Sequence, residues 1–329
     1  QKKKQVEKIF EKQVGLDNFK VGQIIEADPI FNYRNKMEFT FSKNRWILEE
    51  EPLGVESDFA LGMHIPRRWD KILDIDSCDI MPSVGSKIVN FVRDLSKNSS
   101  LKPYDQKTHI GFLRYLMLRF GQNTNELMVN IVTAYEDLDR LVPFVSQLTS
   151  EFSEITTVVN NINTRKADVS FGEKEILLYG QPVLKEKLKN LTFQISSNSF
   201  FQTNTHMAEK LYDAILDEVD SSSNEIAYDL YCGAGSISLF LAQKVKFVYA
   251  FDIIVSSIEN AEENALYNNV ENVDFKVANL DTYFDNHRLS GRPKPDIVVV
   301  DPPRSGMHKK MTSFLPRLQA KKIIYVSCN

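Results

Sequence analysis

Asp229-Leu230-Tyr231-Cys232-Gly233-Ala234-Gly235 places two glycines between a short apolar run and a helical pattern. Glycine is needed in such a turn when a ligand approaches the backbone closely. A complete dinucleotide-binding fingerprint would add a third glycine, and Ser238 stands in that place. The stretch therefore predicts a ligand-binding turn after the first strand of an α/β domain, without the full fingerprint of a dehydrogenase.

The rest of the chain beyond about Thr192 alternates apolar runs of strand length with amphipathic helical patterns, which is typical of a mostly parallel sheet. Ser256 and Glu259 have capping-box spacing, which predicts a helix start there and a helix through Tyr267. We expect five strands in this part, at Ile226–Tyr231, Phe247–Phe251, Val273–Val277, Ile297–Val300 and Ile323–Ser327.

The first half of the chain mixes strand and helix patterns and by itself indicates no chemistry. Residues 112–120 and 127–132 flank a turn-prone segment and predict a β-hairpin. The further elements we expect are strands at 36–42, 155–159 and 175–178 and helices at 84–95 and 138–148. These patterns predict an α/β or α+β domain at residues 1–191, before the Rossmann-like domain at residues 192–329.

Length and composition agree with two domains. The 329 residues are 43% hydrophobic, and no apolar run is long enough to span a bilayer, so we expect a soluble, cytoplasmic protein without a membrane partner. The three cysteines, Cys78, Cys232 and Cys328, show neither a disulfide nor a zinc-ribbon spacing. The oligomeric state stays open.

The net charge of −4 argues against a surface that binds nucleic acid everywhere. Any RNA contact must come from local basic groups, and each group taken alone is more often a solvated face. The candidates are Lys2 to Lys4, Arg34 with Lys36, Arg67 with Arg68, and the strand that holds Arg114 and Arg119.

Two acidic strand ends indicate the kind of ligand. Asp252 ends the second strand, where a carboxylate can accept both hydroxyls of a ribose, so the glycine turn and this acid together predict a nucleoside ligand. The fourth strand ends in Asp301-Pro302-Pro303-Arg304, which favours an S-adenosylmethionine enzyme over a dehydrogenase. Enzymes that methylate exocyclic amines usually have an aromatic residue where this chain has Arg304, so that reaction is disfavoured.

Over nearly its whole length the sequence resembles the RNA uracil C5-methyltransferases, which make 5-methyluridine in ribosomal or transfer RNA. The Phe-Phe-Gln and Ser-Cys-Asn elements are the most specific. The motifs are Tyr33-Arg34-Asn35-Lys36 with Glu38-Phe39, Gly111-Phe112-Leu113-Arg114, Ser199-Phe200-Phe201-Gln202, residues 229–235, Asp301-Pro302-Pro303-Arg304-Ser305-Gly306 and Val326-Ser327-Cys328-Asn329.

The resemblance implies a set of residues for S-adenosylmethionine. Ser236 often corresponds to asparagine in the family and Asp252 to glutamate, and both keep a polar contact. The implied residues are Gln202, Tyr231, Gly233, Gly235, Ser236, Asp252, Asn279 and Asp301. The resemblance also implies an RNA substrate, with 23S ribosomal RNA expected first and transfer RNA second, and we expect Arg304, Arg34 and Lys36 to contact it.

The chemistry explains why a cysteine is needed. C5 of uracil is too weak a nucleophile to take a methyl group unaided, whereas a thiolate that adds to C6 turns C5 into an enolate carbon. Cys328 is the expected nucleophile, although a free cysteine more often closes an apolar strand as a small buried residue. For Cys232 in the glycine turn we expect packing rather than chemistry.

The resemblance also implies segments that this sequence does not contain. The family's catalytic base is a glutamate downstream of the nucleophile, so we expect this chain, ending at Asn329, to lack the base and the last strands of the sheet, to bind cofactor weakly and to turn over inefficiently. Many members begin with a small RNA-binding barrel and three cysteines of an iron–sulfur centre. Cys78 resembles the remote fourth ligand, and one thiolate cannot hold such a cluster, so Cys78 is an orphan ligand or a solitary structural cysteine.

Two rival functions remain at this point. The rival among enzymes is methylation of another substrate, such as cytosine C5 or a protein side chain. It is disfavoured for cytosine because RNA cytosine C5 enzymes usually have a cysteine in the fourth-strand motif, where this chain has Arg304. A catalytically silent RNA-binding or assembly module with a methyltransferase fold is the rival from another class. It predicts RNA binding that is indifferent to S-adenosylmethionine and no covalent trapping by 5-fluorouridine.

Overall fold

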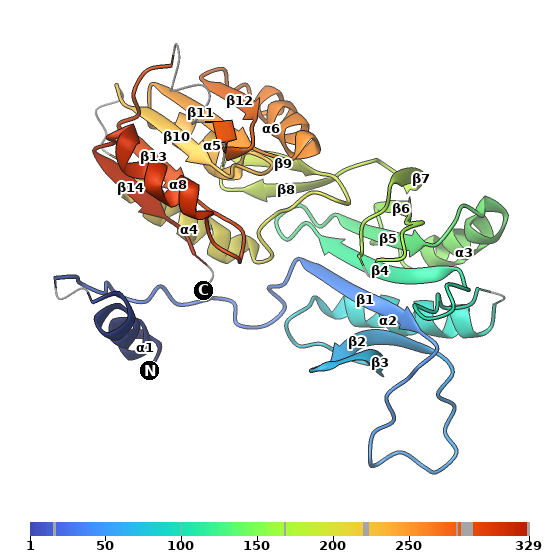
Figure 1. The fold of residues 1–329 in the computed structure, drawn as a ribbon. Helices are drawn as coiled ribbons and strands as arrows, with labels where there is room; N and C mark the ends of the chain where they lie inside the picture. The colour runs from blue at the N-terminus through green and yellow to red at the C-terminus, as the bar shows by residue number, and fades with distance from the viewer. Residues whose placement is uncertain are drawn as a thin grey trace.

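The computed structural model describes all residues except 16–17, 100, 168, 220–223, 281, 284–291 and 328–329. Figure 1 shows two sheets in separate halves of the molecule, joined by the stretch that holds β8 and β9. No helix in the part of the chain that is described is long and apolar enough to cross a membrane.

The first half is built on a seven-stranded sheet with the order β3-β2-β1-β4-β5-β6-β7. Neighbouring strands are antiparallel except β5 and β6, which are parallel. The bounds are β1 (Lys36–Ser42), β2 (Ala60–Ile65), β3 (Arg68–Asp74), β4 (Leu113–Phe120), β5 (Leu127–Thr133), β6 (Thr157–Ile162) and β7 (Lys174–Gly180). Helices α2 (Ser83–Lys97) and α3 (Leu138–Glu151) bury their apolar faces in the same core as the sheet.

The expected elements of this half are confirmed, with shifts of a few residues at their ends, and β1 has the expected bounds. The sequence patterns did not predict β2 and β3. Their residues do not alternate between apolar and polar types. These strands lie toward one edge of the sheet, and β3 carries several charged side chains.

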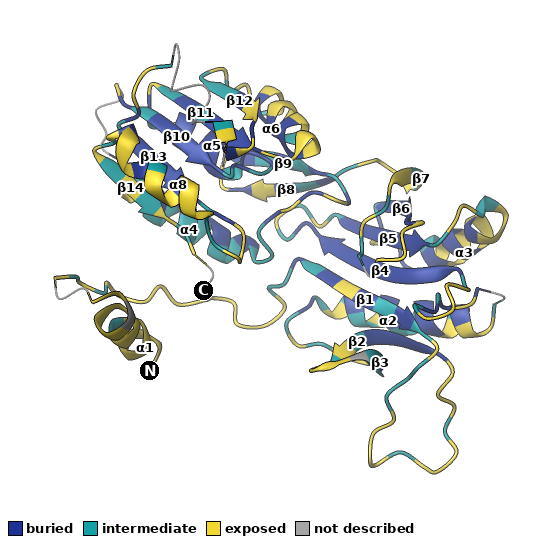
Figure 2. Ribbon diagram, viewed as in Figure 1, coloured by how far each residue is buried: buried dark blue, intermediate teal, exposed yellow. Residues whose placement is uncertain are grey.

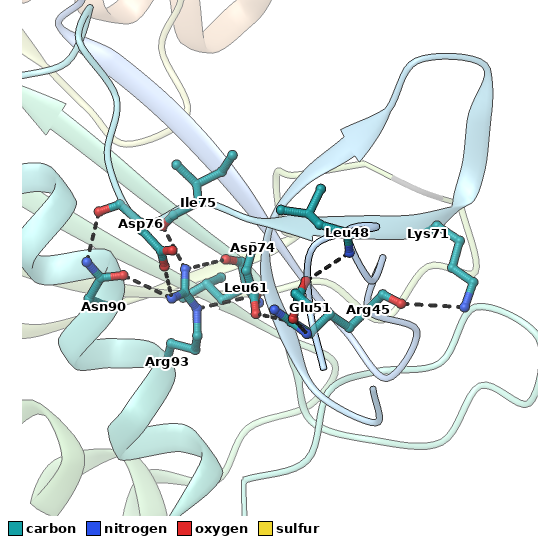
Figure 3. A network of polar contacts seen from close by, with 10 residues as sticks. All are labelled: Arg45, Leu48, Glu51, Leu61, Lys71, Asp74, Ile75, Asp76, Asn90 and Arg93. Carbon is teal, nitrogen blue, oxygen red and sulfur yellow. Dashed lines mark hydrogen bonds and ion pairs between the residues drawn. The ribbon is translucent and has the colours of Figure 1, made fainter. Parts of the chain in front are cut away.

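A network of ion pairs stabilises that edge (Figure 3). The buried Asp74 carboxylate lies between two guanidinium groups: Arg45 Nε donates to Oδ2 at 2.7 Å, and Arg93 Nε lies 3.3 Å from Oδ1. Arg93 on α2 also donates to Ile75 O at 2.7 Å and to Asp76 Oδ1 at 2.8 Å. The network therefore ties the end of β3 to α2.

Two more strands form a hairpin between the halves, β8 (Leu184–Leu188) and β9 (Leu191–Ile195). Leu184, Leu188 and Phe193 are buried in the core of the second half. The hairpin therefore packs on the second sheet. The division into domains at residues 1–191 and 192–329 stays a prediction.

The second half contains a five-stranded parallel sheet with the order β12-β11-β10-β13-β14. All five predicted strands are confirmed, and with them the mostly parallel Rossmann-like fold. Their bounds are β10 (Ile226–Leu230), β11 (Phe247–Asp252), β12 (Val273–Val277), β13 (Ile297–Val300) and β14 (Lys322–Tyr325). Since the strands are parallel, their carboxyl ends meet at one edge of the sheet.

Helices cover both faces of this sheet. One face packs against the hairpin and against α4 (Thr205–Asp217), α5 (Ser236–Ala242) and α6 (Val255–Tyr267). The opposite face packs against Met311 of α8 (Lys309–Phe314) and the residues that follow it. Figure 2 shows the inner strands β10, β11 and β13 largely buried, whereas the edge strands β12 and β14 and the outer helix faces are more exposed.

The predicted capping box at Ser256 is wrong. Helix α6 begins at Val255, its N-cap is Ile254, and no side chain caps it. Asp252 Oδ1 accepts the Ile254 backbone N–H at 2.9 Å. The carboxylate at the strand end therefore bonds the backbone just before the helix, and Ser256 lies inside the helix.

Candidate active site

The turn after β10 holds glycines in conformations that other residues avoid. Gly233 has φ +54° and Gly235 has φ +81°. A Cβ on Gly235 would lie 3.0 Å from Ala261 Cβ and from Phe275 Cζ, whereas a Cβ on Gly233 would have nothing within 4 Å. Gly235 is thus required by packing beneath the turn, while the space beside Gly233 leaves its backbone accessible to a ligand.

Asp252 lies beside this turn at the end of β11. Its Oδ2 accepts the Gly233 N–H at 2.9 Å, so this carboxylate fixes the turn as well as the start of α6. Each carboxylate oxygen has room for more than one hydrogen bond. Asp252 can therefore hold the protein backbone and keep acceptor capacity for ribose hydroxyls, and its binding of a ribose stays a prediction.

A cleft of about 560 Å³ opens at the same edge of the sheet. Two predicted residues, Tyr231 and Asn279, line it together with Ile253 and Leu280, and residues 303 and 305–309 form its other wall. Tyr231 has φ +68°, a conformation that costs energy in a residue with a side chain. Apolar walls with a few polar groups suit a flat heteroaromatic ring such as adenine.

Gln202 and Asp301 meet although nearly a hundred residues separate them. Gln202 Nε2 donates to Asp301 Oδ2 at 3.3 Å. Burial raises the pKa of the Asp301 carboxyl, and the hydrogen bond from Gln202 opposes that rise. The structure thus brings the Phe-Phe-Gln motif of one segment to the Asp-Pro-Pro-Arg motif of another.

Two residues near the site were not predicted. Tyr212 of α4 donates its hydroxyl to Ser236 Oγ at 2.9 Å, and burial raises its pKa. Asp229 is fully buried, accepts a hydrogen bond from Ser238 Oγ at 2.5 Å, and has no partner for Oδ1 within the described residues. The position of Asp229 at the end of a buried strand was the available signal, whereas nothing in the sequence indicated Tyr212.

Three carboxyl groups therefore gather at one edge of the sheet. Burial raises the pKa of Asp229 to about 7, and the negative charges of Asp301 and Asp252 add to the rise. None of the three forms an ion pair with a residue that the structure describes. Such a site favours a cationic ligand. A sulfonium nucleoside with an amino-acid tail matches the turn, the ribose acceptor, the cleft and this charge.

Arg34 and Lys36 lie on the other half of the molecule, at the start of β1. They line a pocket of about 490 Å³ together with Phe200, whose side chain is 66% exposed. Arg34 Nε donates to Lys36 O at 3.1 Å, and Lys36 Nζ pairs with Glu38 at 2.8 Å. Burial lowers the pKa of Lys36. Arg304 is exposed and does not line this pocket.

The basic strand stretch was misinterpreted as a candidate RNA contact. Arg114 and Arg119 are both buried. Arg114 donates to the carbonyls of Asn163, Arg165 and Ala167. Arg119 donates to Ser199 O at 2.7 Å. Both are structural because a guanidinium group offers enough donors to satisfy several backbone carbonyls at once.

The cysteines differ in what the structure says of them. Cys328 lies outside the described residues, so its role stays a prediction. Cys232 is buried in the core of the second half, which confirms packing, and burial raises its thiol pKa. Cys78 is partly buried and its N–H donates to Ser86 Oγ at 3.2 Å. Among the described residues, no group of three or more His, Cys, Asp and Glu side chains could hold a metal ion.

Comparison with known proteins gives a consistent result. The family model described as tRNA (Uracil-5-)-methyltransferase matches residues 147–329. An uncharacterized RNA methyltransferase of Chlorobaculum tepidum is 38% identical over 100% of this chain and 69% of its own length. One from Staphylococcus aureus is 32% identical over 100% of this chain and 70% of its own length.

A solved structure agrees with these sequence relatives. The tRNA (uracil-54, C5)-methyltransferase of Pyrococcus abyssi, solved with S-adenosyl-L-homocysteine, superposes with a TM-score of 0.77 at 28% identity. The match covers 100% of this chain and 72% of that one. The chain therefore belongs to the tRNA (uracil-5-)-methyltransferase family of S-adenosylmethionine-dependent RNA methyltransferases.

Proposed function

We propose that this protein transfers a methyl group to C5 of a uridine in RNA through a covalent bond between Cys328 and C6 of the base. The contact between Gln202 and Asp301 carries the proposal. It joins two family motifs at the carboxyl edge of the parallel sheet, so that a cofactor held by Gln202 and Asp301 lies next to a base oriented by Arg304 of the second motif.

Bound S-adenosylmethionine supplies an electrophilic methyl group on a sulfonium sulfur. The turn and the strand ends hold this cofactor: Asp252 accepts the ribose hydroxyls, and Tyr231 and Asn279 enclose the ring. The complete set in this proposal is Gln202, Tyr231, Gly233, Gly235, Ser236, Asp252, Asn279 and Asp301. The P. abyssi relative with its bound S-adenosyl-L-homocysteine supports the same type of ligand here.

The uracil ring is activated by nucleophilic addition. The Cys328 thiolate forms a bond to C6, the C5–C6 double bond opens, and the electron pair moves through C5 into the C4 carbonyl as an enolate. C5 then accepts the methyl group. A base removes the C5 proton, the double bond re-forms, and the thiolate leaves. Asp301 and Arg304 follow β13 and are proposed to orient the uracil edge or to stabilise the enolate.

The substrate-binding surface extends onto the first half of the molecule. Single-stranded RNA is recognised by stacking and by contacts to splayed bases, and a target base must leave its stack to be modified. The pocket beside Arg34 and Lys36 includes the exposed aromatic ring of Phe200. Phe200 precedes Gln202 by two residues in the sequence. We propose that these basic residues hold RNA next to the site.

The RNA is ribosomal or transfer RNA. The sequence led us to expect 23S ribosomal RNA first. The P. abyssi relative modifies uracil 54 of transfer RNA, and this supports an equal test of transfer RNA. Both RNAs should be assayed side by side with the intact protein.

Covalent trapping tests the mechanism. The intact protein and its Cys328→Ala variant are incubated with S-adenosylmethionine and RNA that contains 5-fluorouridine, and denatured samples are analysed by mass. Fluorine at C5 cannot leave as a proton, so the adduct persists. We expect a complex with the parent protein and with the control Cys232→Ala, whose thiol is buried in the core, and none with Cys328→Ala.

The silent-module alternative gives the opposite result. If cofactor-bound, folded protein forms no adduct with either RNA, the C5 mechanism is wrong. RNA binding that does not respond to S-adenosylmethionine would then favour a binding or assembly module.

A further inference from the structure

The segment Ser196–Thr205, which we call the connecting segment, runs from the end of β9 to the first residue of α4. It carries Phe200, Phe201 and Gln202. Gln202 is its contact with the parallel sheet, through Asp301. Residues of the first sheet and Asn260 of α6 hold other parts of the segment, so its geometry depends on both halves of the molecule.

Asn35 makes the densest set of contacts with this segment. It is 2% exposed and precedes β1. Its side-chain Nδ2 donates to Gln202 O at 2.9 Å and to Thr205 Oγ1 at 2.9 Å, and its backbone N–H donates to Thr203 O at 2.9 Å. One residue of the first half thus holds three residues around Gln202.

The partners of Asn35 are themselves fixed. Thr205 donates its hydroxyl proton to Glu186 Oε2 at 2.7 Å, which leaves the Thr205 oxygen to accept from Asn35. Glu186 is buried and also accepts the backbone N–H groups of Gln122 and Asn123, in the turn between β4 and β5, at 2.8 and 3.0 Å. Asn35 therefore belongs to a rigid polar chain that links the two halves.

A second anchor secures the start of the segment. Buried Arg119 of β4 donates to Ser199 O at 2.7 Å, and Asn161 of β6 donates to Ser197 Oγ at 2.9 Å. From the other half, Asn260 of α6 donates to Ser199 Oγ at 2.9 Å. These contacts fix residues 197–199, whereas Asn35 alone among these anchors bonds Gln202 itself.

We propose that Asn35 is a positioning residue for methyl transfer: it fixes the backbone of Gln202 so that the Gln202 side chain orients Asp301. This inference rests on the proposed function. Glutamine has three side-chain torsions, so its amide group can reach many positions. Holding the backbone of Gln202 limits these positions and keeps the amide within reach of Asp301. Displacement of a positioning group by about 1 Å can lower a rate by about 100-fold.

Asn160 of β6 provides a matched control. Like Asn35 it is buried, and its Nδ2 donates to Ile131 O at 2.8 Å and to Thr133 Oγ1 at 3.0 Å, with a longer contact to Asn161 O at 3.5 Å. Neither side-chain oxygen has a partner within the described residues. The two asparagines thus lose equivalent hydrogen bonds on truncation, but Asn160 does not contact the connecting segment.

The experiment compares Asn35→Ala with Asn160→Ala in the intact protein, assayed for 5-methyluridine formation at a temperature where thermal unfolding shows both to be folded. We expect kcat of Asn35→Ala to fall by about 100-fold with little change in the KM for RNA, because Asn35 is only 2% exposed and therefore offers RNA almost no surface. Asn160→Ala should keep a kcat close to the parent value. Equal kcat values in the two variants would overturn the inference.

A readout without substrate separates this inference from the proposed function. With ¹⁵N-labelled glutamine, the side-chain amide signal of Gln202 is assigned by comparison with Gln202→Glu. Asn35→Ala should shift that signal and Asn160→Ala should not; an unshifted signal overturns the inference even if the parent is active. A parent protein that forms no 5-methyluridine overturns the proposed function instead.

Asn35→Asp covers the case in which Asn35→Ala does not fold. The aspartate keeps the shape of the side chain but cannot donate to Gln202 O or Thr205 Oγ1 when it is ionised. We expect the same loss of kcat and the same shift of the Gln202 signal. A parent-like kcat in this variant would also overturn the inference.

Discussion

The two sheets differ in how they treat carboxylates that are largely removed from solvent. In the first sheet, Asp74 lies between Arg45 and Arg93, so its charge is compensated within the fold. At the carboxyl edge of the second sheet, Asp229, Asp252 and Asp301 gather without an ion-pair partner among the described residues.

This difference separates structural charges from functional ones. Breaking a compensated buried pair leaves one charge stranded, so it costs stability. Uncompensated carboxylates already weaken the folded state, and a protein retains them where a ligand supplies the missing charge. The comparison predicts that changes in the first sheet affect folding, whereas changes at the second sheet edge affect binding.

The largest effect is expected for Arg93→Met. The change removes one partner of Asp74 and the donors to Ile75 O and Asp76, so the free energy of unfolding should fall by about 3–5 kcal/mol. Urea unfolding of both proteins measures it. Arg68→Met, which breaks an exposed pair with Asp70, is the control. A loss no greater than that of the control would contradict the structural role of the compensated charges.

A smaller effect, on binding, is expected for Asp252→Asn. Loss of one charged acceptor should weaken S-adenosylmethionine binding by about 10- to 100-fold, as measured by calorimetry. Asp296→Asn is the matched control, because Asp296 also accepts a backbone N–H, that of Ile226 at 2.9 Å, but at the opposite edge of the same sheet. Equal affinities for the two variants would show that the uncompensated edge does not hold the cofactor.

The pH dependence of stability sharpens the comparison further. The folded pKa of Asp229 is raised from 3.8 to about 7. Its protonated form is therefore favoured by the fold, and this contribution, complete below the unfolded pKa, is lost as pH rises through the folded pKa. Without ligand, Asp229→Asn should flatten the decline in stability between about pH 5 and pH 8 by on the order of 2 kcal/mol. Parallel pH profiles of thermal unfolding for variant and parent would disprove this.

The smallest effect is expected for Lys189→Met. Lys189 joins the β8–β9 hairpin to Asp213 of α4 through an exposed ion pair. Such pairs contribute about 0–1 kcal/mol, so stability and cofactor affinity should both stay close to the parent values. A loss of stability comparable to that of Arg93→Met would show that exposed ion pairs stabilise this protein as much as the ion pairs of Arg93 do.

Local patterns predicted the second half better than the first. Parallel strands buried on both faces have continuous apolar runs, so β10, β11 and β13 could be recognised singly. Strands β2 and β3 lie toward an edge, and Asp74 at the end of β3 is paired with Arg45 and Arg93, which are distant in sequence. The start of α6 was misplaced because the helix begins at Val255 without a side-chain cap, and the carboxylate of Asp252 bonds the backbone just before it.

The candidate site was predicted in its parts but not in its connections. The glycine turn, the acidic residue predicted to bind ribose and the Asp-Pro-Pro-Arg motif each follow from local chemistry at a strand end. The sequence could not show that Arg119 is buried rather than on the surface. Its guanidinium group bonds the carbonyl of Ser199, which is 80 residues away in the chain. The part played by Asn35 depends in the same way on Gln202.

The sequence alone determined the parallel α/β architecture, the glycine turn after β10 and the family resemblance, because periodicity and short motifs are properties of neighbouring residues. Only the tertiary structure decided which charges are compensated and which residues of the first sheet hold the Phe-Phe-Gln segment. Those properties arise from contacts between residues far apart in the chain, whose energies depend on burial and geometry rather than on the local sequence.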